Sequence, residues 1–110
     1  MACRLGDGGG TGASGMQVRW FADAVLDLIG IRDYIAKERP KTANDIAQLI
    51  LENINVLKRN PGIGRPGRIP NTKELIIAGT PYIVPYRVKG GIIEILRVLH
   101  GAMRWPEDLP

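Results

Sequence analysis

The chain has 110 residues and a formal net charge of +4, with 45% hydrophobic and 24% charged residues, which fits one compact domain with a single core. Its one cysteine and one histidine exclude an internal disulfide and a zinc site of three or four Cys/His ligands, and we expect a protein of the reducing cytoplasm. No apolar run approaches the roughly 20 residues of a membrane span, so we expect no membrane segment.

The first residues differ in composition from the rest of the chain. Residues 1–15 are rich in glycine and small polar residues, and this composition favours a flexible segment. We expect them to be a leader that is vector-derived or follows an upstream start. The periodic sequence begins at Met16, and we expect residues 16–110 to form the single domain. Gln17 to Phe21 opens this domain as a short strand.

A first helix is predicted directly after this strand. Asp23 offers a side-chain acceptor at its start, and apolar residues recur at helical spacing as Ala24, Leu28, Ile31 and Ile35. Asp27 and Asp33 fall off this stripe, so we expect both side chains to face solvent. Pro40 ends the helix because proline lacks the backbone donor and restricts the residue before it.

A second helix follows at once and extends to Asn60-Pro61. Its apolar face consists of Ala43, Ile46, Ala47, Ile50, Ile54 and Leu57. Because so few residues separate the two helices, they are predicted to form an antiparallel hairpin.

A basic loop rich in glycine and proline spans residues 61–72 and carries Arg65 and Arg68. It begins the basic half of the domain, since residues 61–104 contain seven Lys/Arg against two Asp/Glu, whereas residues 16–60 contain seven against six. Excess positive charge attracts phosphate backbones or an acidic protein partner. It can also serve only solubility, and the sequence leaves both interpretations open.

Three strands are predicted after the loop, at residues 73–78, 82–88 and 92–100, with Lys89-Gly90-Gly91 as a tight turn suited to positive φ. Pro85 lies inside the second strand and cannot donate to a ladder, which indicates a bulge or a partly unpaired side. The apolar helix faces can pack on one face of a mainly antiparallel sheet of three to four strands. We therefore predict an α+β domain.

Several segments, taken in this order, resemble toxins of the RelE/ParE superfamily. They are LDLI and IRDYI in the first helix, NPGIGRPGR in the loop, EL in the next strand, YIVPYRV in the middle strand and RVLHGAMRW at the end of the last. The resemblance covers Met16 to about Trp105. It implies the toxin of a bacterial type II toxin–antitoxin module, often labelled a plasmid-stabilisation protein, which a cognate antitoxin neutralises in a hetero-oligomer and which needs no cofactor or metal.

The superfamily contains two activities on this fold, so the fold alone does not choose between them. ParE-like toxins poison DNA gyrase by binding it, whereas RelE-like toxins cleave mRNA on the ribosome with basic side chains and a group that helps activate the 2′-OH. The ribonuclease branch usually has an arginine directly after the first aromatic residue of the middle strand, and here Ile83 follows Tyr82. We therefore expect ParE-like action on gyrase. An RelE-like mRNA endonuclease and a degenerate interaction module without toxicity remain the alternatives.

The candidate site residues come from the same resemblance. His100 and Arg97 would be catalytic only in a ribonuclease, which would be metal-independent, because a histidine has the pKa range of a general acid or base. Contacts with the target or with nucleic acid are expected from Arg65, Arg68, Arg87, Arg104 and Trp105.

Each candidate also has a purely structural interpretation. Arg97 in an apolar strand can pair with a carboxylate such as Glu74 across the sheet, and His100 can be a packing or hydrogen-bonding residue. Tyr82 and Tyr86 share one face of their strand, so we expect them in or beside the core rather than as stacking platforms for bases. The loop arginines can be solvated charges, and the tryptophans can be packing anchors.

Overall fold

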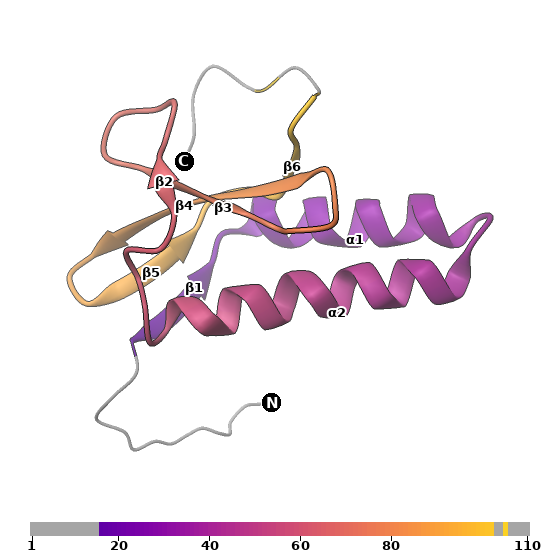
Figure 1. The fold of residues 1–110 in the computed structure, drawn as a ribbon, viewed down its shortest axis with the longest axis horizontal. Coiled ribbons are helices and arrows are strands. Elements are labelled where there is room, and N and C mark those ends of the chain that lie inside the picture. Colours follow the sequence, from indigo (N-terminus) through magenta and orange to yellow (C-terminus); the bar gives the residue numbers. More distant parts are fainter. Residues whose placement is uncertain (1–15, 103–104, 106–110) are drawn as a thin grey trace.

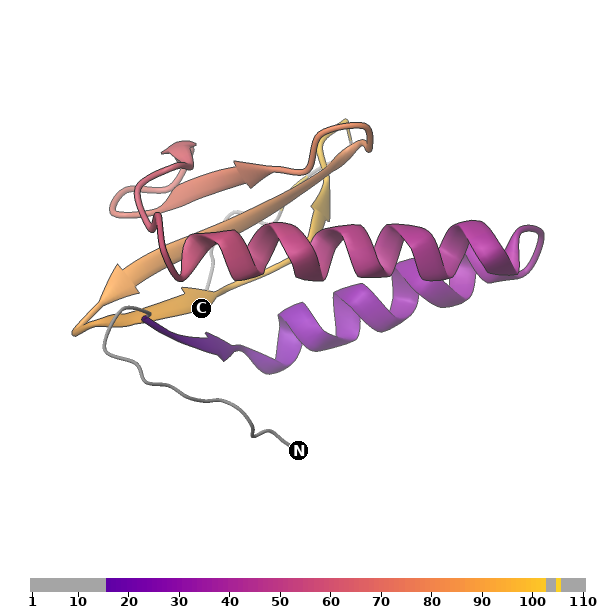
Figure 2. The same ribbon diagram turned by 60° about the horizontal axis from the view of Figure 1, so that its bottom comes forward.

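The computed structural model of the chain describes residues 16–102 and 105. Its helices are α1 (Ala22–Ala36) and α2 (Pro40–Leu57), and they lie side by side as an antiparallel hairpin on one face of a sheet (Figures 1 and 2). No helix in this described part of the chain is long and apolar enough to cross a membrane. The predicted leader, residues 1–15, lies outside the described residues.

The sheet contains six strands. In chain order they are β1 (Gln17–Trp20), β2 (Arg65–Pro66), β3 (Lys73–Ile76), β4 (Tyr82–Lys89), β5 (Ile92–Ile95) and β6 (Leu99–His100). Their order across the sheet is β1-β5-β4-β3-β2, with β6 also paired to β4. The β1–β5 pair is parallel and the other pairs are antiparallel. The α+β prediction is confirmed, but the sheet has more strands than expected, because the basic loop contributes β2 and the last predicted strand is split in two.

The helix boundaries follow the expected signals with one correction. α1 begins at Ala22, and the residue that precedes it, Phe21, provides no side-chain cap. Asp23 therefore lies inside the first turn rather than before it, where its negative charge favours the positive end of the helix dipole. Pro40 is the first residue of α2, a position at which the missing N–H costs nothing.

The core lies between the helices and the sheet. Its fully buried side chains come from both helices, β4, β5 and the residues that directly follow β3 and β5, and they include Ala24, Ile50, Leu57, Ile77, Val84, Tyr86, Ile93 and Ile95. Strand side chains alternate between the two faces of a sheet. The neighbours of these buried residues in the strands therefore point to the opposite face, which we call the open face.

Tyr86 connects this core to the basic loop. Its hydroxyl donates a hydrogen bond to the Pro61 carbonyl at 2.7 Å and accepts one from the Gly64 N–H at 2.9 Å. A side chain at Gly64 would place its Cβ 2.6 Å from that hydroxyl, so the close approach requires glycine. Burial raises the pKa of Tyr86. The phenol therefore remains protonated and holds the loop at its start.

A bulge separates β5 from β6. Tyr86 pairs with Ile95 and Ile83 pairs with Leu99, so two residues of β4 lie opposite three residues, 96–98. Because Pro85 lacks an N–H, the ladder cannot continue there, and the Leu96 N–H to Pro85 carbonyl bond of 3.0 Å is where it ends. Of the two outcomes expected from the proline, a bulge or a partly unpaired side, the structure shows a bulge, and the extra residue lies in the partner strand rather than in β4. An extra residue of this kind changes the direction of the side chains that follow it.

The β4–β5 hairpin has the predicted turn. Gly90 and Gly91 adopt positive φ angles of 58° and 77°, which suits the two-residue turn of a twisted hairpin.

Candidate functional site

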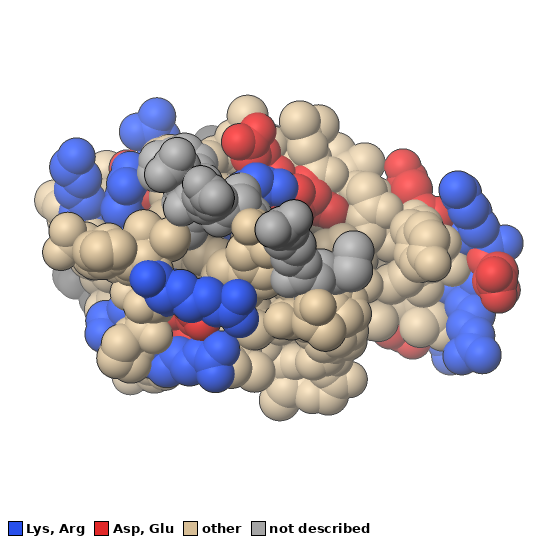
Figure 3. All heavy atoms as spheres, turned by 90° about the horizontal axis from the view of Figure 1, so that it is seen from above, with Lys and Arg blue, Asp and Glu red and all other residues tan. Residues whose placement is uncertain are grey.

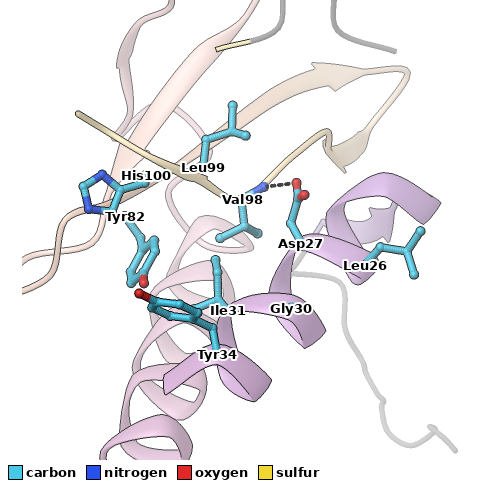
Figure 4. A pocket seen from close by; sticks show the side chains of 9 residues that line it. All are labelled: Leu26, Asp27, Gly30, Ile31, Tyr34, Tyr82, Val98, Leu99 and His100. Atoms are coloured by element: carbon cyan, nitrogen blue, oxygen red, sulfur yellow. Dashed lines mark hydrogen bonds between the residues drawn. The ribbon is translucent and has the colours of Figure 1, made fainter. Parts of the chain in front are cut away.

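A groove opens between α1 and the end of the sheet where β6 pairs with β4. Its volume is about 750 Å³. The side chains that line it come from α1, β4 and the chain from Val98 onward (Figure 4), and they are Leu26, Asp27, Gly30, Ile31, Tyr34, Tyr82, Val98, Leu99 and His100. Most of this lining is apolar, with a few polar groups at the rim. We call this site the helix-side groove, and such a lining suits the apolar side chains of a ligand.

Aromatic residues form one wall of the helix-side groove. The rings of Tyr82 and His100 meet edge to face, with their centroids 5.7 Å apart and their planes at 85°. The hydroxyl groups of Tyr82 and Tyr34 point toward one another (Figure 4). Burial raises the pKa of Tyr82, and the nearby Tyr34 raises it further. The Tyr82 phenol is therefore protonated near neutral pH and can donate a hydrogen bond.

His100 is held by its own chain segment. Its Nδ1 accepts a hydrogen bond from the Ala102 N–H at 3.1 Å, which leaves Nε2 as the ring nitrogen free to meet a partner. Its carbonyl accepts a hydrogen bond from the Trp105 indole N–H at 3.1 Å. These contacts agree with the interpretation of His100 as a packing and hydrogen-bonding residue.

α1 exposes apolar side chains beside the groove. Leu26 is 65% exposed and Tyr34 is 75% exposed, and Val25 and Ile29 are exposed as well. In α2 the apolar residues are more strongly confined to one side. A patch of exposed apolar side chains next to a groove is typical of a protein interaction site.

Asp27 binds the bulge between β5 and β6. Its carboxylate accepts hydrogen bonds from Arg97 Nε at 2.6 Å, from Arg97 Nη2 at 2.9 Å and from the Val98 N–H at 3.0 Å. The hydrogen bond to Asp27 raises the pKa of the Arg97 guanidinium, although desolvation opposes it. Two expectations are therefore wrong. Asp27 does not face solvent, and the carboxylate that pairs with Arg97 is Asp27 rather than Glu74, because strand alternation places Arg97 on the helix side with Ile93 and Ile95 whereas Glu74 lies on the open face.

A row of charges crosses the open face of the sheet from β1 to β4. Arg19, Glu94 and Arg87 are direct neighbours in the register of β1, β5 and β4. Glu94 lies 2.5 Å from Arg87 Nε and 3.9 Å from an Arg19 nitrogen. The hydrogen bond from Arg87 lowers the pKa of Glu94. Both guanidinium groups also lie over the Phe21 ring, at 5.3 and 5.6 Å from its centre.

A second cluster of charges holds the basic loop against β3. Glu74 is only 2% exposed and lies 3.0 Å from Arg65 Nη2 and 3.8 Å from Arg68 Nε. It also accepts a hydrogen bond from the Arg68 backbone N–H at 2.9 Å. Arg68 stacks over the Trp105 ring, 3.7 Å from its centre. The loop arginines are therefore bound to a buried carboxylate and are not simply solvated.

The basic side chains gather at two ends of the molecule. Seen from above Figure 1, they lie around the β2–β3 region and the β4–β5 hairpin on one side and at the α1–α2 connection on the other (Figure 3). Arg104, also expected as a contact, lies outside the described residues. Among the residues that the structure describes, no group of three or more His, Cys, Asp or Glu is placed to hold a metal ion.

The structure separates the predicted site residues into two places. His100 lines the helix-side groove and Arg97 is bound at its edge, whereas Arg87 and Arg65 lie on the open face. Sequence reasoning did not find Asp27, Tyr34 or Arg19. The only signal for Asp27 was an acidic residue in the second turn of a helix that is otherwise apolar on most sides, and this signal does not identify its partner.

Comparison of the sequence with known proteins gives matches over nearly all of the described domain. The sequence model of a family described as the ParE toxin of type II toxin–antitoxin system, parDE, matches residues 18–105. The chain is 40% identical over 93 residues to "Putative toxin Y4kP" of Sinorhizobium fredii, covering 84% of this chain and 96% of that protein. It is 34% identical over 86 residues to "Toxin RelE2" of Caulobacter vibrioides, covering 78% of this chain and 96% of that protein.

Solved structures give the same picture. A chain of the chromosomal ParDE toxin–antitoxin system from P. aeruginosa superposes with a TM-score of 0.73 and 33% sequence identity, covering 80% of this chain and 98% of that one. A chain of the toxin–antitoxin complex RelBE2 from Mycobacterium tuberculosis superposes with a TM-score of 0.54 and 26% identity, covering 78% of this chain and 98% of that one.

Proposed function

Because the chain belongs to the ParE toxin family of the RelE/ParE superfamily and is the toxin of a type II toxin–antitoxin system, we propose that it acts in the ParE-like manner, by binding DNA gyrase rather than by cutting RNA. We also propose that residues 16–110 form a single toxin domain, that the protein is cytoplasmic, and that a cognate antitoxin neutralises it in a hetero-oligomer.

The separation of His100 from the arginines is the observation that carries this proposal. A general acid or base must come within about 3 Å of the proton that it moves, with cations around the same phosphate. The His100 ring lies in an apolar groove against α1, whereas Arg65 and Arg87 lie on the open face and each pairs with a glutamate. Arg97, the other residue expected in a ribonuclease, is held by Asp27. This arrangement favours a surface for binding over an assembled ribonuclease site.

The gyrase contact is proposed for the segment from Arg97 to Trp105. Trp105 lies between the Arg68 guanidinium and the His100 carbonyl, so these two contacts give the end of the segment a defined place beside the basic loop. The half-exposed Arg65 and Arg68 would then meet the same target surface. Arg104 belongs to this segment by sequence and would add a further positive charge.

The antitoxin is proposed to occupy the helix-side groove. The groove is apolar, and α1 adds the exposed Leu26 and Ile29 beside it. An amphipathic segment that places aliphatic side chains along such a surface would bury them all at once. The polar side of that segment would remain in water, and acidic residues on it would be attracted by the net positive charge of the chain.

Two parallel assays test the proposed function. The purified full chain is incubated with gyrase and supercoiled DNA, and separately with translating ribosomes. We expect inhibition of gyrase, relief of that inhibition by the cognate antitoxin, and intact mRNA. Cleavage of mRNA on the ribosome that is lost in folded His100→Ala or Arg97→Ala protein would overturn the gyrase proposal and make those residues catalytic.

The ribonuclease remains the second candidate because the 34% identical relative is named as a RelE toxin. The third candidate, an interaction module without toxicity, predicts salt-dependent binding to nucleic acid and normal growth at high expression of folded protein. Expression of residues 16–110 without the antitoxin separates this candidate from both toxins, since either toxin would arrest growth.

A further inference from the structure

We propose that Asp27 is a positioning residue, which fixes the bulge at residues 96–98 and so, together with the pairing of β6 to β4, the place of His100 and Trp105. This inference rests on the proposed function, in which the segment from Arg97 to Trp105 contacts gyrase. Asp27 itself lies on α1 and would act through Arg97 and Val98, to which its carboxylate is bound.

The bulge creates the need for such a residue. Val98 is 2% exposed, and a buried N–H without a partner is costly. Its N–H bonds to the Asp27 carboxylate on a helix at 3.0 Å instead of to a strand. The last ladder bond before this point is the one from Leu96 to Pro85. Between that bond and β6, the path of the chain is therefore fixed from α1 rather than from the sheet.

The form of the ion pair determines an orientation as well as a distance. Two nitrogens of Arg97 meet the two carboxylate oxygens of Asp27, at 2.6 and 2.9 Å. A planar guanidinium bound in this two-pronged way fixes the plane of both groups. The side chains of the pair remain 23% and 17% exposed, so water screens their attraction and limits their contribution to stability. The main effect of the pair is therefore to fix the orientation of the chain at the bulge.

A short series of contacts connects the bulge to the proposed contact surface. Only one residue separates Val98 from His100, whose carbonyl binds the Trp105 indole N–H. Trp105 in turn lies under the Arg68 guanidinium. If Asp27 no longer holds the bulge, the first link in this series is loosened, and we expect the environment of the Trp105 indole to change.

The test compares Asp27→Asn with Asp33→Asn in the full-length chain. Both variants remove one negative charge from α1, but Asp33 is exposed. Asn at position 27 keeps an acceptor for the Val98 N–H and loses the charged pair with Arg97. We expect Asp27→Asn to weaken gyrase inhibition about tenfold, which corresponds to ~1.4 kcal/mol, and to shift the Trp105 indole N–H resonance in an NMR spectrum. Asp33→Asn should leave both unchanged.

A stability control and a double variant complete the test. Ile54→Val removes one buried methyl group from α2 and destabilises the fold modestly without touching the bulge. At a temperature where the protein stays folded, this variant should leave gyrase inhibition and the Trp105 resonance unchanged. If Asp27 acts through Arg97, the double variant Asp27→Asn/Arg97→Gln should lose no more inhibition than the stronger single variant. Losses that simply add would overturn the inference.

The test separates the two proposals. If the wild-type chain does not inhibit gyrase, the proposed function is wrong, and the Trp105 resonance then decides the inference by itself. An unshifted resonance in Asp27→Asn would show that Asp27 does not position the segment.

Discussion

The two faces of this domain differ in whether their side chains find partners within the protein. On the open face, arginines surround two glutamates, so Arg65, Arg68 and Arg87 meet their opposite charges within the protein. On the helix side, Leu26 and Tyr34 are left largely exposed beside an apolar groove. A basic sequence alone draws attention to the first face. The comparison indicates instead that the residues which the structure describes leave the groove uncovered and that much of the charge has a structural role.

The largest effect is expected from Glu74→Ala. This change removes the hydrogen-bond acceptor of the Arg65 side chain and of the Arg68 N–H, and the ion-pair partner of the Arg68 side chain. Two hydrogen bonds to a charged group are lost, those from the Arg65 side chain and the Arg68 N–H, and we expect the free energy of unfolding to fall by about 3 kcal/mol, as measured by urea denaturation. Glu52→Ala, on the surface of α2, is the control and should change it little. A near-neutral Glu74→Ala would contradict the structural role of this cluster.

The next largest effect concerns the helix-side groove. Leu26→Lys places a charge where we propose that the antitoxin buries aliphatic side chains, so the dissociation constant for the antitoxin should rise by roughly ten- to a hundredfold. Because Leu26 is exposed, the melting temperature should hardly change. Titration calorimetry with the purified antitoxin measures the affinity, and Leu51→Lys on α2 provides the matched control. Equal losses in both variants would place the antitoxin elsewhere.

A smaller effect is expected where the core holds the basic loop. Tyr86→Phe removes the hydroxyl that binds Pro61 and Gly64 but keeps the ring. The free energy of unfolding should fall by about 1.5 kcal/mol, and amide hydrogen exchange should become faster near Gly64. Tyr34→Phe, an exposed tyrosine on α1, should change neither quantity. Unchanged exchange near Gly64 in Tyr86→Phe would mean that the loop is held by Glu74 alone.

The smallest effect is a change in pH dependence. The hydrogen bond from Arg87 lowers the pKa of Glu94 in the folded state. The ionised pair therefore stabilises the fold above the ordinary pKa of a glutamate, and this contribution is lost as the pH falls through the lowered value. In Arg87→Gln the stability should fall less steeply with acid, as measured by urea denaturation across this pH range. Arg19 is the more distant partner of Glu94. In Arg19→Gln the unfolding free energy should therefore fall with acid almost as steeply as in the wild type.

Local patterns were sufficient to predict most of the fold. The apolar spacing of the helices, Pro40 between them and the glycine pair at residues 90–91 each act over a few neighbouring residues, and the structure confirms all three. The division of the last strand was missed although Pro85 signalled it. The sequence shows that a proline leaves one side of its strand without a donor, but the bulge that results lies at residues 96–98 of the partner strand, which was predicted as continuous.

The pairing of the charges could not be predicted, because it depends on which residues the fold brings together. Arg97 and Asp27 are 70 positions apart in the chain, and nothing in either sequence segment indicates the other. Glu74 was predicted as the partner of Arg97 because both lie in strands. Strand alternation instead places Arg97 on the helix side with Ile93 and Ile95, whereas Glu74 lies on the open face. The predicted target contacts Arg65, Arg68 and Trp105 do lie together, because Arg65 and Arg68 share Glu74 as their partner and Arg68 lies over the Trp105 ring.

One measurement tests most directly whether the helix-side groove is where this toxin meets its antitoxin. Amide hydrogen exchange of the full chain is compared in the free state and with the cognate antitoxin bound, followed by mass spectrometry of short peptides. We predict slower exchange in α1 and at residues 98–100, with β1 and the β4–β5 hairpin unchanged. Slower exchange confined to the strands that carry Arg19, Glu94 and Arg87, with α1 unchanged, would contradict the account.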